Sequence, residues 1–148
     1  MNSIITKSAQ ETALLGQKLG KESKGGEIYL LIGDLGGGKT QFTKGLAAGL
    51  GITEPVTSPT FNYENIYDGR DGLELYHFDL YRSEKIDNDI RDLMLESFAD
   101  QGAITVVEWA ERAEEFWPED ATVIEFDWVS ENERKVIINS KLKPQNAK

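Results

Sequence analysis

A glycine-rich segment directly behind a short apolar run constrains the fold of this chain more than any other feature. Residues 28–32, Ile-Tyr-Leu-Leu-Ile, form an unbroken apolar run, as in a strand buried on both faces of a parallel sheet. The next eight residues, Gly-Asp-Leu-Gly-Gly-Gly-Lys-Thr at 33–40, match the pattern G-x-x-x-x-G-K-[ST]. A helix is predicted from about Lys39 to Leu50. The order strand, glycine-rich turn, helix is the context in which this pattern forms a phosphate-binding loop, or P-loop.

Each position of this pattern has a chemical task. Glycines let the backbone curl so that successive N–H groups point at phosphate oxygens. The N-terminus of the following helix adds unpaired N–H donors and the positive end of its dipole. We expect Lys39 to reach the β- and γ-phosphates and the Thr40 hydroxyl to bind Mg²⁺. The residues predicted to cradle the nucleotide are Gly33, Asp34, Leu35, Gly36, Gly37, Gly38, Lys39 and Thr40.

A P-loop also needs a carboxylate near the magnesium ion, and two are well placed. Asp79 closes the β-rich run 75–78, and Glu108 closes a second buried-strand candidate, residues 104–107. In open α/β sheets, ligands bind at the carboxyl ends of the strands. Either carboxylate could bind Mg²⁺, directly or through water, and either could orient the attacking water. Each could instead be an ordinary surface residue at a strand end.

Two further features have a structural and a functional interpretation. Ser58-Pro59-Thr60 follows the P-loop helix, and a Thr on a mobile loop could sense the γ-phosphate as switch loops do. The alternative is that Pro59 starts an edge strand. His77 precedes Asp79 by two residues, so both side chains point to the same face of a strand. A hydrogen-bonded structural histidine is the favoured interpretation, and an orienting role beside the site is the alternative.

The composition excludes several classes of protein. The 148 residues contain no Cys and one His, which excludes disulfides and thiolate zinc sites and disfavours His-rich metal centres and Ser-His-Asp hydrolases. The formal net charge of −10 disfavours direct nucleic-acid binding, because phosphate backbones are held by clustered Lys and Arg. The N-terminal residues lack the pattern of a signal peptide, and no apolar run approaches the roughly 20 residues of a membrane span. We therefore expect a cytoplasmic protein with no membrane association.

The rest of the chain predicts one α/β domain over residues 1–140, followed by a polar tail at 141–148 that is expected to be disordered. Residues 8–11 fit the capping box of a helix that Gly25-Gly26 would end. The turn at 68–72 predicts a hairpin, and apolar residues from Ile90 to Phe98 have helical spacing. Further strands are predicted at 104–107, 122–128 and 135–140, which indicates a sheet with an antiparallel portion.

Four ordered motifs resemble one family. They are the loop 33–40, residues 58–61 (Ser-Pro-Thr-Phe), residues 77–82 (His-Phe-Asp-Leu-Tyr-Arg) and residues 107–109 (Val-Glu-Trp). In order and spacing they are similar to TsaE, formerly YjeE, the small bacterial ATPase needed for threonylcarbamoyladenosine modification of tRNA. The resemblance spans most of the chain. It implies a P-loop NTPase-like three-layer sandwich with a mixed, partly antiparallel sheet, ATP and Mg²⁺ as ligands, and TsaD and TsaB as partners. The acidity of the chain predicts no strong direct binding of tRNA.

The resemblance also implies roles for individual residues. By resemblance, Thr40 and Glu108 are the expected magnesium ligands, and Asp79 is expected to be a nucleotide-site carboxylate needed for activity. The predicted catalytic residues are Asp79, Glu108 and Lys39. Ser58 and Thr60 fall on the family's switch-like segment. Ala9, within the stretch 8–12, and Asn132 fall where the family closes over adenine. The chain departs from the family at 83–89, which lacks the usual Pro and Gly, and at 93–95, which lacks the usual Gly.

Three other functions remain alternatives. A P-loop small-molecule kinase needs a basic lid, but residues 83–100 contain two basic and six acidic residues. A GTP-dependent switch needs an N-K-x-D-type segment, and the sequence has none. A nucleotide-gated binding module without significant turnover stays open. Hydrolysis by the chain alone is expected to be slow, with Arg82 as a candidate arginine finger in cis and a partner as the source of one in trans.

Overall fold

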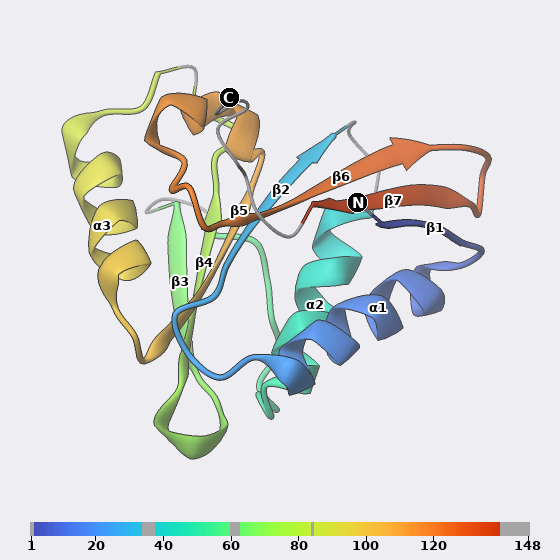
Figure 1. Ribbon diagram of the computed structural model, residues 1–148, viewed down its shortest axis with the longest axis horizontal. Helices are drawn as coiled ribbons and strands as arrows, with labels where there is room; N and C mark the ends of the chain where they lie inside the picture. The colour runs from blue at the N-terminus through green and yellow to red at the C-terminus, as the bar shows by residue number, and fades with distance from the viewer. Residues whose placement is uncertain (1, 34–37, 60–62, 84, 140–148) are drawn as a thin grey trace.

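The computed structural model describes residues 2–33, 38–59, 63–83 and 85–139, so the predicted tail at 141–148 lies outside the described residues (Figure 1). The described strands form one seven-stranded sheet in the order β1-β7-β6-β2-β5-β4-β3. The strands are β1 (Asn2–Thr6), β2 (Ile28–Gly33), β3 (Glu64–Asp68), β4 (Glu74–Asp79), β5 (Ala103–Glu108), β6 (Thr122–Trp128) and β7 (Arg134–Asn139). The helices are α1 (Ala9–Glu22), α2 (Lys39–Gly49) and α3 (Asn88–Ala99), with 3₁₀ segments at Arg70–Gly72 and Ala110–Phe116.

The centre of the sheet is parallel and its margins are antiparallel. Strands β6, β2, β5 and β4 run parallel to one another, whereas β3 pairs antiparallel with β4, and β7 pairs antiparallel with both β6 and β1. In this register Glu108 at the end of β5 lies opposite Leu31 of β2 and Asp79 of β4. The carboxyl ends of β2, β5 and β4 therefore meet at one edge, which is where ligands bind in α/β sheets.

Helices cover both faces of the sheet, so the expected three-layer arrangement with a mixed sheet is confirmed. In Figure 1, α1 and α2 lie on one side of the central strands and α3 on the other. The alternation of side chains along β2 explains this division: Leu31 packs with Phe42 and Leu46 of α2, whereas Leu30 packs in the second core cluster with Met94 of α3. None of the helices in the described ranges has both the length and the apolar character needed to cross a membrane.

The predicted helices and strands are confirmed, with small shifts at their ends, and two differences have a clear physical cause. Helix α1 ends at Glu22 instead of continuing to Gly25-Gly26, because Ser23 turns to an extended backbone and its hydroxyl donates to the Leu19 carbonyl at 2.8 Å. Strand β1 was not predicted. Its first residues are polar, so the sequence there shows no strand pattern. The strand forms because it pairs antiparallel with the edge of β7.

Helices α1 and α2 approach each other closely enough that their contact requires glycines. A Cβ added to Gly45 of α2 would overlap the carbonyl oxygen of Ala13 on α1, and one added to Gly16 of α1 would overlap the carbonyl oxygen of Phe42 on α2. Backbone therefore packs on backbone across this interface. Because α1 is capped at Ser8 and α2 begins at Lys39, the interface also sets the spacing between the starts of the two helices.

We expect Gly45→Ala to lower the free energy of unfolding by about 1–3 kcal/mol, because the added methyl group must push two backbones apart. Urea unfolding measures the change. Gly102→Ala is the matched control, since a Cβ there would lie in ordinary contact, 3.5 Å from Asp100 Oδ1; it should change stability by no more than about 0.5 kcal/mol. Equal stability of the two variants would contradict the close approach of the helices.

Candidate functional site

The chain leaves the sheet at Gly33, the last residue of β2. Gly33 has φ 127°, and an added Cβ would overlap the carbonyl oxygen of Phe126 on β6, so only glycine fits here. Its N–H donates to Glu111 Oε2 at 3.2 Å. Asp34, Leu35, Gly36 and Gly37 lie outside the described residues, so their predicted roles stay predictions. On the far side, Gly38 is the N-cap of α2, which begins at Lys39 as expected.

The Lys39 ammonium lies at the base of the loop. The residue is 4% exposed, and Nζ donates to the Gly33 carbonyl oxygen at 2.7 Å. Nζ also lies 4.1 Å from the centre of the Trp109 ring, which in turn contacts the Tyr81 ring at a centroid distance of 5.1 Å. The Lys39 ammonium is therefore held between the Gly33 carbonyl oxygen and the Trp109 ring, whose face attracts positive charge.

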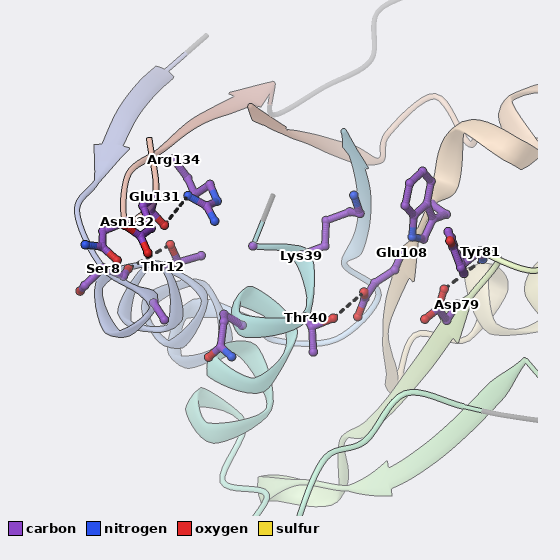
Figure 2. A pocket seen from close by; sticks show the side chains of 14 residues that line it. Ser8, Thr12, Lys39, Thr40, Asp79, Tyr81, Glu108, Glu131, Asn132 and Arg134 are labelled. Atoms are coloured by element: carbon purple, nitrogen blue, oxygen red, sulfur yellow. Dashed lines mark hydrogen bonds between the residues drawn. The ribbon is translucent and has the colours of Figure 1, made fainter. Parts of the chain in front are cut away.

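The Glu108 carboxylate ties α2 to two strands of the sheet. Glu108 is 2% exposed. Its Oε1 accepts a hydrogen bond from Thr40 Oγ1 at 3.2 Å, as Figure 2 shows. Its Oε2 lies 3.0 Å from Thr43 Oγ1 and 2.8 Å from His77 Nε2. A buried carboxylate is stable only when its oxygens are hydrogen-bonded, and these three side chains supply the bonds.

The Thr40 hydroxyl and the Glu108 carboxylate fit a magnesium ion that arrives with a phosphate. Magnesium prefers oxygen ligands and is commonly held by one or two carboxylates together with phosphate oxygens and water. The two side chains supply such oxygens 3.2 Å apart, at the start of a helix whose glycine N-cap has no side chain to occupy the amides. Within the described ranges, no group of three or more His, Cys, Asp or Glu could hold a metal ion unaided.

Asp79 lies beside Glu108 across the β4–β5 pairing. Its Oδ1 accepts a hydrogen bond from the Tyr81 N–H at 3.0 Å. Burial raises the pKa of Asp79 above its ordinary value, and the nearby Glu108 charge adds to this, while the Tyr81 N–H opposes it. A carboxylate with a raised pKa is a better proton acceptor than a solvated one.

These residues line an elongated pocket of about 400 Å³. Figure 2 shows Lys39, Thr40, Asp79, Tyr81 and Glu108 along one end, and the start of α1 and the β6–β7 turn at the other. The volume lies in the usual range of small-molecule sites. The complete lining is Ser8, Ala9, Thr12, Gly38, Lys39, Thr40, Gln41, Asp79, Tyr81, Glu108, Trp109, Glu131, Asn132 and Arg134.

The far end of the pocket contains both residues that the family resemblance placed near adenine, Ala9 and Asn132. Arg134, which sequence reasoning did not single out, holds the turn that carries Asn132: it donates to the Ser130 carbonyl oxygen at 2.7 Å and to that of Glu133 at 2.9 Å. The available signal was its position at the end of the polar turn 130–134, but nothing local in the sequence shows that this turn faces α2.

A second hollow of about 250 Å³ shares Asp79 and Tyr81 with the main pocket. Ser58 lines it, so the described part of the switch-like segment lies beside Asp79. Thr60 lies outside the described residues, and its predicted role stays a prediction. Arg82 also lines this hollow and is absent from the lining of the main pocket.

Comparison with known proteins relates the chain to one family. The family described as "Threonylcarbamoyl adenosine biosynthesis protein TsaE" matches residues 6–136. The protein named tRNA threonylcarbamoyladenosine biosynthesis protein TsaE in Treponema pallidum is 37% identical over 134 residues, covering 90% of this chain and 97% of that protein. The protein of the same name in Bacillus subtilis is 39% identical over 132 residues, covering 88% of this chain and 80% of that protein. A crystal structure of Bacillus subtilis YdiB has a TM-score of 0.79 and 35% identity, covering 95% of this chain and 85% of that one.

We expect Asp79→Asn to stabilise the protein at pH 7. The pKa of Asp79 is higher in the folded protein than its ordinary value of 3.8, so the folded state binds this proton more tightly than the unfolded state. Stability therefore falls as pH rises from about 3.8 through the raised pKa. Asparagine keeps the acceptor for Tyr81 and never ionises, so its advantage should be full at pH 7 and vanish near pH 3.5. Urea midpoints at the two pH values measure it.

The control for this experiment is Asp68→Asn, which changes an exposed carboxylate on β3. Its effect on the urea midpoint should not depend on pH in the same way. An Asp79→Asn protein that is less stable than the original at pH 7 would contradict the unfavourable burial of the Asp79 charge.

Proposed function

The chain belongs to the TsaE family of tRNA threonylcarbamoyladenosine biosynthesis proteins, and from this premise we propose that it binds ATP with Mg²⁺ and hydrolyses it as an accessory ATPase of that modification. One observation carries the proposal. Thr40 Oγ1 and Glu108 Oε1 lie 3.2 Å apart at the start of α2, beside the buried ammonium of Lys39. This is the combination of hydroxyl, carboxylate and cation that a P-loop needs for a magnesium-bound triphosphate.

The shape of the pocket supports a nucleotide lying along it. The phosphates would lie at the end formed by Lys39, Thr40 and the amides at the start of α2. The base would lie toward Ala9 and Asn132, at the other end of the same pocket. The Trp109–Tyr81 pair closes the phosphate end on the side of Lys39.

Hydrolysis would depend on positioning of the reactants and on charge neutralisation, because the protein forms no covalent bond to the transferred phosphoryl group. Lys39 would hold phosphate oxygens through its ammonium, and Thr40 and Glu108 would hold a magnesium ion. The ion would supply neutralisation of the charge that develops on the phosphate oxygens. Asp79, which lines both hollows and has a raised pKa, is the carboxylate better suited to orient water and accept its proton.

The partners we propose are TsaD and TsaB. The net charge of −10 disfavours direct binding of tRNA by this chain, so the partner complex would bind the tRNA. Arg82 lines the hollow next to the main pocket, beside Asp79, and no arginine from the described residues lines the phosphate end itself. Turnover by the chain alone is therefore expected to be slow, and the partner pair should accelerate it.

Lys39→Ala should weaken binding of Mg-ATP by about a hundredfold, because a charge-assisted hydrogen bond is worth about 1.5–3 kcal/mol. Isothermal titration calorimetry measures the affinity. Lys44→Ala is the control: it removes the same charge from an exposed position on α2 and should leave the affinity unchanged. Unchanged affinity in Lys39→Ala would refute the assignment of residues 33–40 as a phosphate-binding loop.

Glu108→Gln should lower magnesium-dependent turnover by at least about tenfold while magnesium-free ATP binding changes little, because the charge that holds the metal is lost and the shape is kept. Phosphate release with Mg²⁺, and ATP affinity in EDTA, measure the two effects separately. Glu115→Gln, an exposed carboxylate in the 3₁₀ segment 110–116, is the control. Equal loss of both properties would assign Glu108 a purely structural role.

The experiment that tests the proposed function is phosphate release from Mg-ATP by this chain alone and with TsaB and TsaD added. We expect slow release alone and a clear increase with the pair, because the partners complete the active site. ATP binding without release under both conditions would overturn the ATPase and leave a nucleotide-gated binding module.

A further inference from the structure

One buried polar side chain next to the pocket has no part in the proposed function. His77 is the only histidine of the sequence, lies on β4 and is 1% exposed. Its Nε2 lies 2.8 Å from Glu108 Oε2, and its Nδ1 has no hydrogen-bond partner among the described residues. An unpaired buried nitrogen costs stability, so a hydrophobic side chain would suit a purely structural position better. His77 does not line the pocket, and its hydrogen-bond contact with a residue that does is the one to Glu108.

The hydrogen bonds around Glu108 indicate what His77 contributes, which is a hydrogen-bond donor to Glu108 Oε2. Thr43 Oγ1 lies 3.0 Å from Glu108 Oε2 and also 3.0 Å from the Lys39 carbonyl oxygen. A hydroxyl has one proton, so Thr43 can donate to only one of these two acceptors at a time. The carboxylate oxygens of Glu108 only accept, so the His77 contact requires a proton on Nε2. His77 is then the donor that Oε2 keeps when Thr43 turns to the helix backbone.

We propose that His77 is a positioning residue that holds Glu108 Oε2 in the protein interior, so that Oε1 faces Thr40 and the metal position. This deepens the proposed function and depends on it. The two oxygens of Glu108 divide their tasks: Oε2 is held by β4 and α2 from within, and Oε1 is presented beside the Thr40 hydroxyl. Groups that orient a metal ligand from behind commonly change metal affinity or activity by about 10- to 100-fold when removed.

The hydrogen bond itself can be tested without nucleotide or metal. Because the chain has a single histidine, ¹⁵N labelling of histidine gives signals from one imidazole ring. The protein should show a proton on Nε2, and this proton should exchange slowly with water. A ring protonated on Nδ1 alone, or one that mixes both tautomers, would overturn the proposal.

The functional consequence is tested with His77→Leu and His77→Gln. Leucine removes the donor at similar volume, whereas the glutamine side-chain N–H₂ can reach the place of Nε2. We expect the Mg²⁺ concentration for half-maximal ATP hydrolysis to rise about tenfold in His77→Leu and less than about threefold in His77→Gln. ATP affinity in EDTA should stay within about twofold in both variants, because no nucleotide contact is changed.

Thr105→Val is the matched control. It removes a buried side-chain hydrogen bond on β5, that of Thr105 to Ser97 at 3.0 Å, away from the pocket. It should lower the melting temperature without changing the Mg²⁺ requirement. A wild-type Mg²⁺ requirement in folded His77→Leu would overturn the positioning role and leave the ATPase intact. If His77→Leu does not fold, a tenfold higher requirement in His77→Gln would overturn it. Failure of the unmodified protein to bind Mg-ATP would instead refute the proposed function.

Discussion

The buried carboxylate of Glu108 is the point on which the arrangement of the site depends. It lies at the end of β5, where the neighbouring strand and α2 converge, and its burial requires hydrogen-bond donors on more than one side. Thr40 and Thr43 tie it to α2, and His77 ties it to β4. The same bonds that compensate for its burial also fix the direction in which one of its oxygens points.

The close packing of α1 on α2 gives the pocket its length. Backbone contact at Gly16 and Gly45 keeps the two helices at a distance that no larger residue would allow. The start of α2 supplies Lys39 and Thr40, and the start of α1 supplies Ala9. The two ends of the pocket are thus built on one rigid pair of helices. A ligand that contacts both ends contacts a surface whose spacing is set by the fold.

Asp79 occupies the boundary between the main pocket and the second hollow. It is held by the Tyr81 N–H, and its charge is disfavoured by burial and by Glu108. Ser58 and Arg82 lie in the second hollow with it. A partner that changes the environment of that hollow would therefore act on Asp79, the carboxylate that we propose orients water, without entering the main pocket itself. This arrangement supports our proposal that the chain alone hydrolyses ATP slowly.

The local patterns of the sequence predicted the strand that ends at Gly33, the helix that begins at Lys39, the hairpin around the turn 68–72, and the positions of Asp79 and Glu108 at strand ends, because each depends on neighbouring residues alone. Tertiary packing set three other features: β1 pairs with β7, His77 and Thr43 both bond Glu108, and the turn held by Arg134 faces the start of α2. These features join residues far apart in the chain. The periodicity of the sequence does not predict them. They arise from the order of the strands and from helix packing that brings distant side chains within hydrogen-bond distance.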